Sequence, residues 1–201
     1  ALREVLDPIK GPRPPFVGDA RWRHAETFAR LVGIRDTWQR HDPNWQRACE
    51  VSNVIRMLSL DACLQRGPGR ILSLADDIGA DLWAKHMTSA RGAAKHAVRT
   101  TVNGKRVAIV SSVLLTSDAA DALGDEADIV AGFDYVQRTE GPRVTLQWSL
   151  RGHGVDVAAI AKRYGGGGHT AAAGFQDVVI DDAGNMVMRA NPYERAEVLF
   201  A

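Results

Sequence analysis

The chain is poor in cysteine, carries almost no net charge and lacks a long apolar run, and each shortage excludes a class of protein. Two cysteines, Cys49 and Cys63, are too few for a disulfide framework or a zinc site in 201 residues. No stretch approaches the roughly 18 apolar residues of a membrane-spanning helix. With 25 basic and 24 acidic residues the net charge is +1, so no overall field attracts nucleic acid or a membrane surface. These absences favour a cytoplasmic protein with reduced cysteines and no membrane partner.

What the chain does have is the composition of an ordinary globular protein, with 45% hydrophobic and 24% charged residues. Its length allows one or two domains. Apolar residues recur at helical spacing in the first half and at strand spacing in much of the second. We therefore expect an α/β fold in three parts. A helical part covers residues 1–72, a connector helix covers 73–98, and a small mixed-sheet α/β domain covers 99–201.

The pattern also predicts individual elements. The first half should hold three helices. The first runs from Ala20 to Val32 and ends at Gly33. The second covers residues 44–66 and stops at Gly67-Pro68-Gly69, and the third runs from Ser73 or Asp76 to about Ala97. The second half opens with a hairpin around Asn103-Gly104, a strong turn signal. After it we expect three helices: one from Ser117 or Asp118 to Leu123, one from Val155 to Tyr164, and a final one starting at Pro192. We expect strands over residues 128–133, 143–150 and 175–180, with a turn at Gly141-Pro142 before the second. Met186–Met188 would be the hairpin partner of the strand over 175–180.

The most unusual stretch is a run of four glycines, Gly165, Gly166, Gly167 and Gly168, followed by His169, Thr170 and three alanines. Glycine weakens helices and strands, whereas alanine is the best helix former. This order predicts a loop and then a short helix starting near His169. Free backbone N–H groups at a helix N-terminus make an anion site. The alternative is a tight packing turn. No Lys-Ser/Thr follows the glycines, so a P-loop is excluded.

Other residues near the run are candidates for the same site. Arg151 ends a predicted strand before a Gly turn, and its guanidinium suits a two-pronged grip on phosphate. If Ser149 and Gln147 face a ligand, Trp148 points into the core. His153 and Tyr164 are further candidates for this site, but an exposed turn histidine and a core tyrosine are the simpler interpretations.

The run and its flanks resemble the DHHA1 domain, the C-terminal substrate-binding part of the DHH phosphoesterase superfamily. Gly165–His169 followed by Ala172-Ala173-Gly174-Phe175 carries the resemblance, together with Ser149-Leu150-Arg151 upstream. The match covers about residues 100–180 and extends faintly to Ile34–Trp38. It implies a phosphodiester or phosphoanhydride substrate in a nucleotide or short oligonucleotide, and leaves a homodimer possible. It also implies that Gly166–Gly168 offer N–H groups to a phosphate, that Arg151 clamps it, and that His169 contacts it or assists the leaving oxygen.

The resemblance implies Mn²⁺ or Mg²⁺ in the full-length parent, but this chain has no Asp-His-His motif. The acids and histidines of the first half, His24, Asp36, His41 and Asp42, fit no metal template and are better explained as caps, turns or surface charges. We therefore expect the substrate-binding portion of such an enzyme, with its metal-binding part removed or lost. The alternatives are a non-catalytic nucleotide or single-strand binding module, and a structural role for the Gly run. A tRNA-editing role gains little support from the small net charge.

Overall fold

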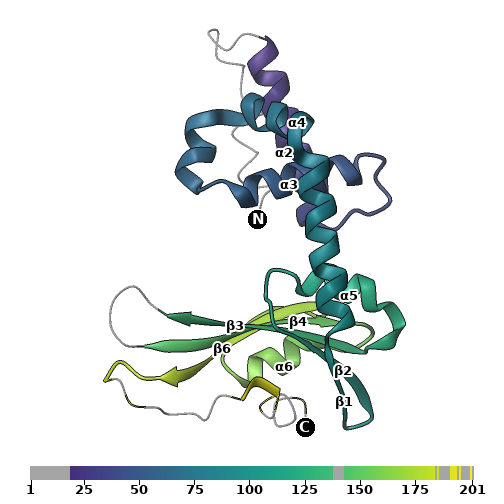
Figure 1. Cartoon of the computed structure of the whole chain (residues 1–201), viewed down its shortest axis with the longest axis vertical. Coiled ribbons are helices and arrows are strands. Elements are labelled where there is room, and N and C mark those ends of the chain that lie inside the picture. The colour runs from purple at the N-terminus through teal and green to yellow at the C-terminus, as the bar shows by residue number, and fades with distance from the viewer. Residues whose placement is uncertain are drawn as a thin grey trace. The chain divides into compact units, whose positions relative to one another are not determined.

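The computed structural model describes residues 19–137, 143–183, 185, 191–193, 195 and 200. The chain forms two compact units, Ala1–His86 and Met87–Ala201, and the boundary falls inside helix α4 (Leu60–Lys95) (Figure 1). Within the described residues no helix is long and apolar enough to cross a membrane. The first 18 residues of the expected helical part, the turn expected at Gly141-Pro142 and the hairpin partner expected at Met186–Met188 lie outside the described residues.

The first unit is helical, with α2 (Asp19–Asp36), α3 (Trp45–Met57) and the first part of α4. These helices enclose one apolar core, whose buried members are Leu31, Ile34, Ala48, Val51, Val54, Ile71, Leu72 and Ala75. The predicted helix end at Gly33 is wrong, because α2 continues to Asp36. Ile34 and Arg35 beyond it are 3% and 5% exposed. Their packing extends the helix past a residue that costs about 1 kcal/mol there.

The single helix predicted over residues 44–66 is wrong as well. Leu58 adopts an extended conformation (φ −93°, ψ 150°) and ends α3. The Ser59 hydroxyl then accepts a hydrogen bond from the Ala62 N–H at 3.2 Å and caps the start of α4. Gly67 (φ 70°, ψ 169°) has a non-helical backbone, so α4 consists of two helices that meet at a kink there, and the predicted stop at Gly67-Pro68-Gly69 is confirmed. Cys49 and Cys63 therefore lie on different helices, and both are free thiols.

The second unit is built on a mixed six-stranded sheet in the order β1-β2-β3-β4-β6-β5. Only β2 and β3 are parallel, and the other neighbouring pairs are antiparallel. The strands are β1 (Val98–Val102), β2 (Lys105–Val110), β3 (Ile129–Gln137), β4 (Val144–Gly152), β5 (Gly167–His169) and β6 (Ala172–Ile180). This architecture confirms the α/β fold class. The predicted hairpin is also confirmed, since Asn103 and Gly104 both have positive φ (50° and 73°) between β1 and β2.

Helices α5 (Thr116–Leu123) and α6 (Val157–Arg163) lie on opposite faces of the sheet (Figure 1). Asp156 caps α6, because its carboxylate accepts from the N–H groups of Ala158 and Ala159. The predicted cap of α5, Ser117 or Asp118, is wrong. Leu115 occupies that position without a side-chain bond, and both predicted caps lie inside the helix.

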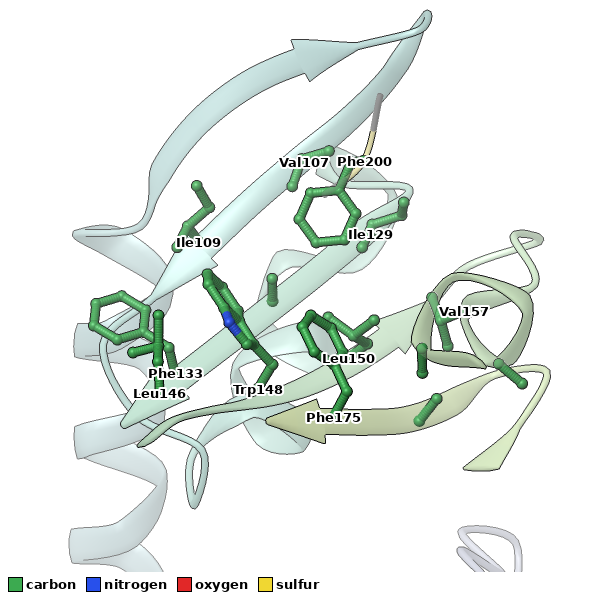
Figure 2. Packing of buried hydrophobic residues seen from close by; sticks show 14 of the residues in the cluster. Val107, Ile109, Ile129, Phe133, Leu146, Trp148, Leu150, Val157, Phe175 and Phe200 are labelled. Carbon is green, nitrogen blue, oxygen red and sulfur yellow. The ribbon is translucent and has the colours of Figure 1, made fainter. Parts of the chain in front are cut away.

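We call the α6 side the packed face. There the apolar side chains of the central strands form one cluster with Val157 of α6, as Figure 2 shows for Trp148, Leu150 and Phe175. Trp148 is 1% exposed and its ring lies 6.0 Å from that of Phe175. The prediction that Trp148 points into the core is therefore confirmed.

The helix predicted from His169 is wrong. After the Gly run the chain forms the edge strand β5, turns at Thr170 and Ala171, and returns as β6. β6 pairs with β4 along its length, with Ala172 opposite Arg151. Hydrogen bonding into an existing sheet overrides the helix propensity of the alanines. Of the predicted final helix, residues 192, 193 and 195 are helical, and most of the rest lies outside the described residues.

Candidate functional site

The opposite side of the sheet, which we call the polar face, brings the predicted residues together. Arg151 on β4 pairs with Ala172 on β6, and Ala172 pairs with His169 on β5. Residues directly opposite one another in a sheet point to the same face. Two strand spacings separate the Cα atoms of Arg151 and His169, which is about 10 Å. His169 is exposed and Arg151 is half-buried on this face.

Arg151 is held in place by three hydrogen bonds. Its Nε donates to the Ser117 hydroxyl at 2.8 Å. Its Nη1 donates to the Ser149 hydroxyl at 3.2 Å and to the Leu150 carbonyl at 2.7 Å. With the described residues, Nη2 makes no hydrogen bond, and it is not among the buried atoms that lack a partner. A braced guanidinium with two outward N–H groups is preorganised for an anion.

Two acidic residues of α5 moderate this charge. Burial lowers the pKa of the Arg151 guanidinium, while attraction from Asp118 and Asp121 raises it. Asp118 is 2% exposed, so one of these counter-charges is built into the fold. Arg151 remains charged at neutral pH, and its Nη2 group makes no hydrogen bond with a described residue.

The predicted row of free glycine amides is not formed as expected. The Gly166 N–H donates to the Ala161 carbonyl at 3.0 Å and the Gly165 N–H to the Lys162 carbonyl at 3.2 Å. These two amides finish α6 and are occupied. Gly167 and Gly168 lie in β5, which is the last strand of the sheet. The implied Gly166 contact with a phosphate is thus wrong, because its donor is used within the fold.

Steric demands explain three of the four glycines. Gly165 and Gly168 have φ of 75° and 144°, where side chains are rarely tolerated. A Cβ on Gly166 would overlap the Gly174 carbonyl oxygen and lie 2.5 Å from the Phe175 Cβ. Gly167 is different, because its φ is not positive and a Cβ there would meet nothing within 4 Å. The structural interpretation of the run therefore accounts for all of it except Gly167, which stands on the polar face in register with Gly174 and Ser149.

Tyr164 and His153 are not part of this arrangement. The Tyr164 ring stacks on Phe175 with centroids 5.2 Å apart, and the Arg195 guanidinium lies 5.5 Å from its centre. That aromatic ring is thus engaged in the core. His153 lies in the exposed turn after β4, where its backbone N–H donates to the Asp128 carbonyl at 2.8 Å.

The sequence did not reveal Ser117 or the environment of Arg35. Ser117 lies 34 residues from Arg151 in sequence, and only the position of α5 brings it to the guanidinium. In the first unit, the Arg35 guanidinium lies 4.0, 5.1 and 5.6 Å from the rings of Trp38, Trp45 and Trp83. This aromatic enclosure stabilises a buried cation, and the spacing of the tryptophans gave no signal of it.

No metal site is found among the described residues, since they contain no group of three or more metal-binding side chains. Asp42, one of the acidic residues considered as a metal ligand in the sequence, is a turn residue. Its carboxylate accepts from the backbone N–H of Asn44 at 2.7 Å and from the Asn44 side chain at 2.9 Å, and this hydrogen bonding lowers its pKa. The described residues do not fit the Mn²⁺ or Mg²⁺ that the resemblance implies.

Comparison with known proteins adds little beyond this geometry. No family model matches the chain, and no curated protein matches it. Among solved structures, the pGpG-specific phosphodiesterase PggH from Vibrio cholerae matches 69% of this chain with 16% identity and a TM-score of 0.40. An uncharacterized protein from Helicobacter pylori G27 matches 98% with 14% identity and a TM-score of 0.36. The chain spans 46% and 64% of those two chains. Both TM-scores are too low to support a fold family or a function for this chain.

Proposed function

We propose that this chain binds a phosphate group of a nucleotide or short oligonucleotide on the polar face, as the substrate-binding portion of a DHH-type phosphoesterase. The observation that supports it best is the row of Arg151 and His169. A braced cation and an imidazole on one exposed face offer complementary hydrogen bonds to a phosphate. Ser149 and Ser117 position Arg151 through its Nη1 and Nε. The resemblance of residues 149–151 and 165–175 to the DHHA1 pattern supports the same class of ligand.

In this proposal each group has one role. Arg151 binds phosphate oxygens through the two outward Nη2 hydrogens. His169 contacts the same phosphate and, in an active enzyme, donates a proton to the leaving oxygen. Gly167 leaves room for the ligand where a side chain would stand. Because the described residues do not fit Mn²⁺ or Mg²⁺, we derive no metal-dependent step.

The second candidate is a non-catalytic nucleotide or single-strand binding module that uses the same face. The lack of a metal-binding group among the described residues favours it. The two candidates share the Arg151–His169 contact and differ only in turnover.

One experiment tests the contact and separates the candidates. The purified chain is titrated with a labelled short oligonucleotide and with a dinucleotide, with and without Mn²⁺, and product is measured in the same samples. We expect saturable binding that weakens with salt, since phosphate contacts release counterions. His169→Ala and Arg151→Lys should each weaken binding at least tenfold, about 1.4 kcal/mol. Lysine keeps the charge but loses the forked geometry.

His96→Ala is the matched control, because His96 is an exposed histidine of the same unit at the end of α4. Its affinity should equal that of the wild type. Unchanged affinity in folded His169→Ala protein removes His169 from the site. No binding by the wild type rejects the proposal, metal-dependent product supports the enzyme, and binding without product supports the module.

A further inference from the structure

A second polar row lies on the same face, beyond the Arg151–His169 row. Gln147 on β4 pairs with Gln176 on β6 and, on its other side, with Asp134 on β3. Gln147 and Gln176 are therefore neighbours that point to the same side as Arg151. Arg151 is four positions after Gln147 on β4, which is about 14 Å at the rise of an antiparallel strand.

The two amides are available to a ligand. Neither Gln147 nor Gln176 makes a side-chain hydrogen bond with another described residue, and Gln176 is exposed while Gln147 is half-buried. The amide atoms of Gln147 are not among the buried polar atoms that lack a partner, so they are open to solvent or to a ligand. Asp134 beside them is held, since one of its carboxylate oxygens accepts from the Val113 N–H at 2.9 Å. The amides are thus the adaptable polar groups of this row.

Between the two rows the sheet carries almost no side chains. The intermediate row consists of Ser149, Gly174 and Gly167 across β4, β6 and β5. A Cβ on Gly174 would lie 2.7 Å from the Trp148 carbonyl oxygen, so the fold itself requires that glycine. Gly167 has no such requirement, and its bare backbone extends the flat surface to the edge of the sheet. A flat strip of this kind accommodates a ring lying on the sheet.

We propose that Gln147 and Gln176 bind the edge of a nucleobase whose phosphate is held by Arg151, with the sugar over Gly174 and Gly167. This inference rests on the proposed function and names its substrate class as base-bearing nucleotides, adenine in particular. An amide presents a donor and an acceptor side by side. That pair matches the N6 amino group and N7 of adenine.

The test compares a deoxyadenosine dinucleotide with the same molecule whose bases are replaced by abasic tetrahydrofuran sites. Wild-type protein should bind the adenine dinucleotide at least tenfold more tightly than the abasic one. The double variant Gln147→Met, Gln176→Met keeps side-chain volume and removes both amides. It should reduce that ratio to less than about threefold while its affinity for the abasic molecule stays unchanged. Gln137→Met is the matched control, because Gln137 is an exposed glutamine of β3 that points to the packed side of the sheet.

The outcomes separate this inference from the function on which it rests. If the double variant keeps the wild-type ratio, the amides do not bind the base and the inference is overturned, while phosphate binding stands. Equal wild-type affinity for both molecules also overturns it. If Arg151→Lys leaves the affinity for the abasic dinucleotide unchanged, the phosphate contact itself fails and both proposals fall. Loss of the ratio in the Gln137→Met control would show a general structural effect and would overturn the assignment to Gln147 and Gln176.

Discussion

The two faces of strand β4 differ in burial and polarity. Leu146, Trp148 and Leu150 point to the packed face and are at most 1% exposed. The alternate residues Ser149 and Arg151 are half-buried on the polar face, and their polar atoms bond mainly to each other and to α5. The packed face carries the larger apolar core of the unit. A smaller core lies on the other face, where α5 packs against Ala108, Val110 and Val130 of β2 and β3, so the polar residues of β4 are the part of that face that can vary. Period-two alternation thus places the core residues and the candidate site residues on opposite faces of one nine-residue strand.

The largest effect should come from the packed face. Trp148→Ala removes a fully buried aromatic that lies between Phe133 and Phe175, with ring centroids 5.7 and 6.0 Å away. We expect a loss of about 3–5 kcal/mol in the free energy of unfolding, measured by urea denaturation. Gln147→Ala on the opposite face of the same strand should change it by less than about 0.5 kcal/mol. Equal losses in the two variants would contradict the division between the faces.

Trp148→Phe sharpens this comparison. Trp148 Nε1 is buried and has no hydrogen-bond partner among the described residues. Phenylalanine keeps an aromatic ring and removes that unsatisfied donor, so part of the cost of lost volume is offset. We expect Trp148→Phe to lose less than half as much unfolding free energy as Trp148→Ala. A loss as large as that of the alanine variant would mean that the indole N–H is satisfied in the folded protein.

The sequence predicted the parts of the second unit that local rules control. Asn103-Gly104 determines a two-residue turn, and the alternation of residues 143–150 assigns Trp148 to the core. The prediction from sequence failed where contacts between distant residues determine the ends of a helix. Gly33 and the break at Leu58 depend on which side chains the core of the first unit buries, and a propensity scale does not contain that information.

The candidate site shows the same limit. The sequence indicated Arg151, Ser149 and His169, and the register places all three on one face. The prediction failed after the Gly run, because the three alanines there favour a helix in isolation, whereas in the fold Ala171 lies in a turn and Ala172 and Ala173 pair with β4. The contact between Ser117 and Arg151 could not be predicted, since no local sequence pattern links two residues that are 34 positions apart.

The Gly run offers a finer way to test the comparison of faces, with a smaller expected effect. Gly166→Ala would force a Cβ against the Gly174 carbonyl and Phe175, and we expect about 1–3 kcal/mol of destabilisation from overpacking. Gly167→Ala meets open space and should leave the urea midpoint unchanged while it weakens dinucleotide binding severalfold. The two variants differ by one position and carry the same new methyl group. Unchanged binding in Gly167→Ala would mean that no ligand passes over that residue.

The smallest effect concerns the ends of the strands, where neither face is involved. Asp128 precedes β3 and accepts hydrogen bonds from the backbone and side chain of Arg106 on β2, at 2.8 and 2.7 Å. These bonds lower the Asp128 pKa to about 2, below the ordinary value of about 3.9. The folded state thus favours the ionised carboxylate. Its contribution to stability is complete above about pH 5 and is lost as the pH falls through about 2.

Asp128→Asn should therefore lower the urea midpoint slightly at neutral pH, and its difference from the wild type should shrink between about pH 4 and pH 2. Asp125→Asn is the control, because Asp125 contributes its backbone carbonyl to Arg106 at 2.5 Å and keeps that contact in the variant. High salt should reduce the effect, since the pair is near the surface. A difference that stays constant down to about pH 2 would show that the Asp128 charge does not stabilise the β2–β3 junction. The backbone bond from the Arg106 N–H, which asparagine can also accept, would then account for the stabilisation at this end of the sheet.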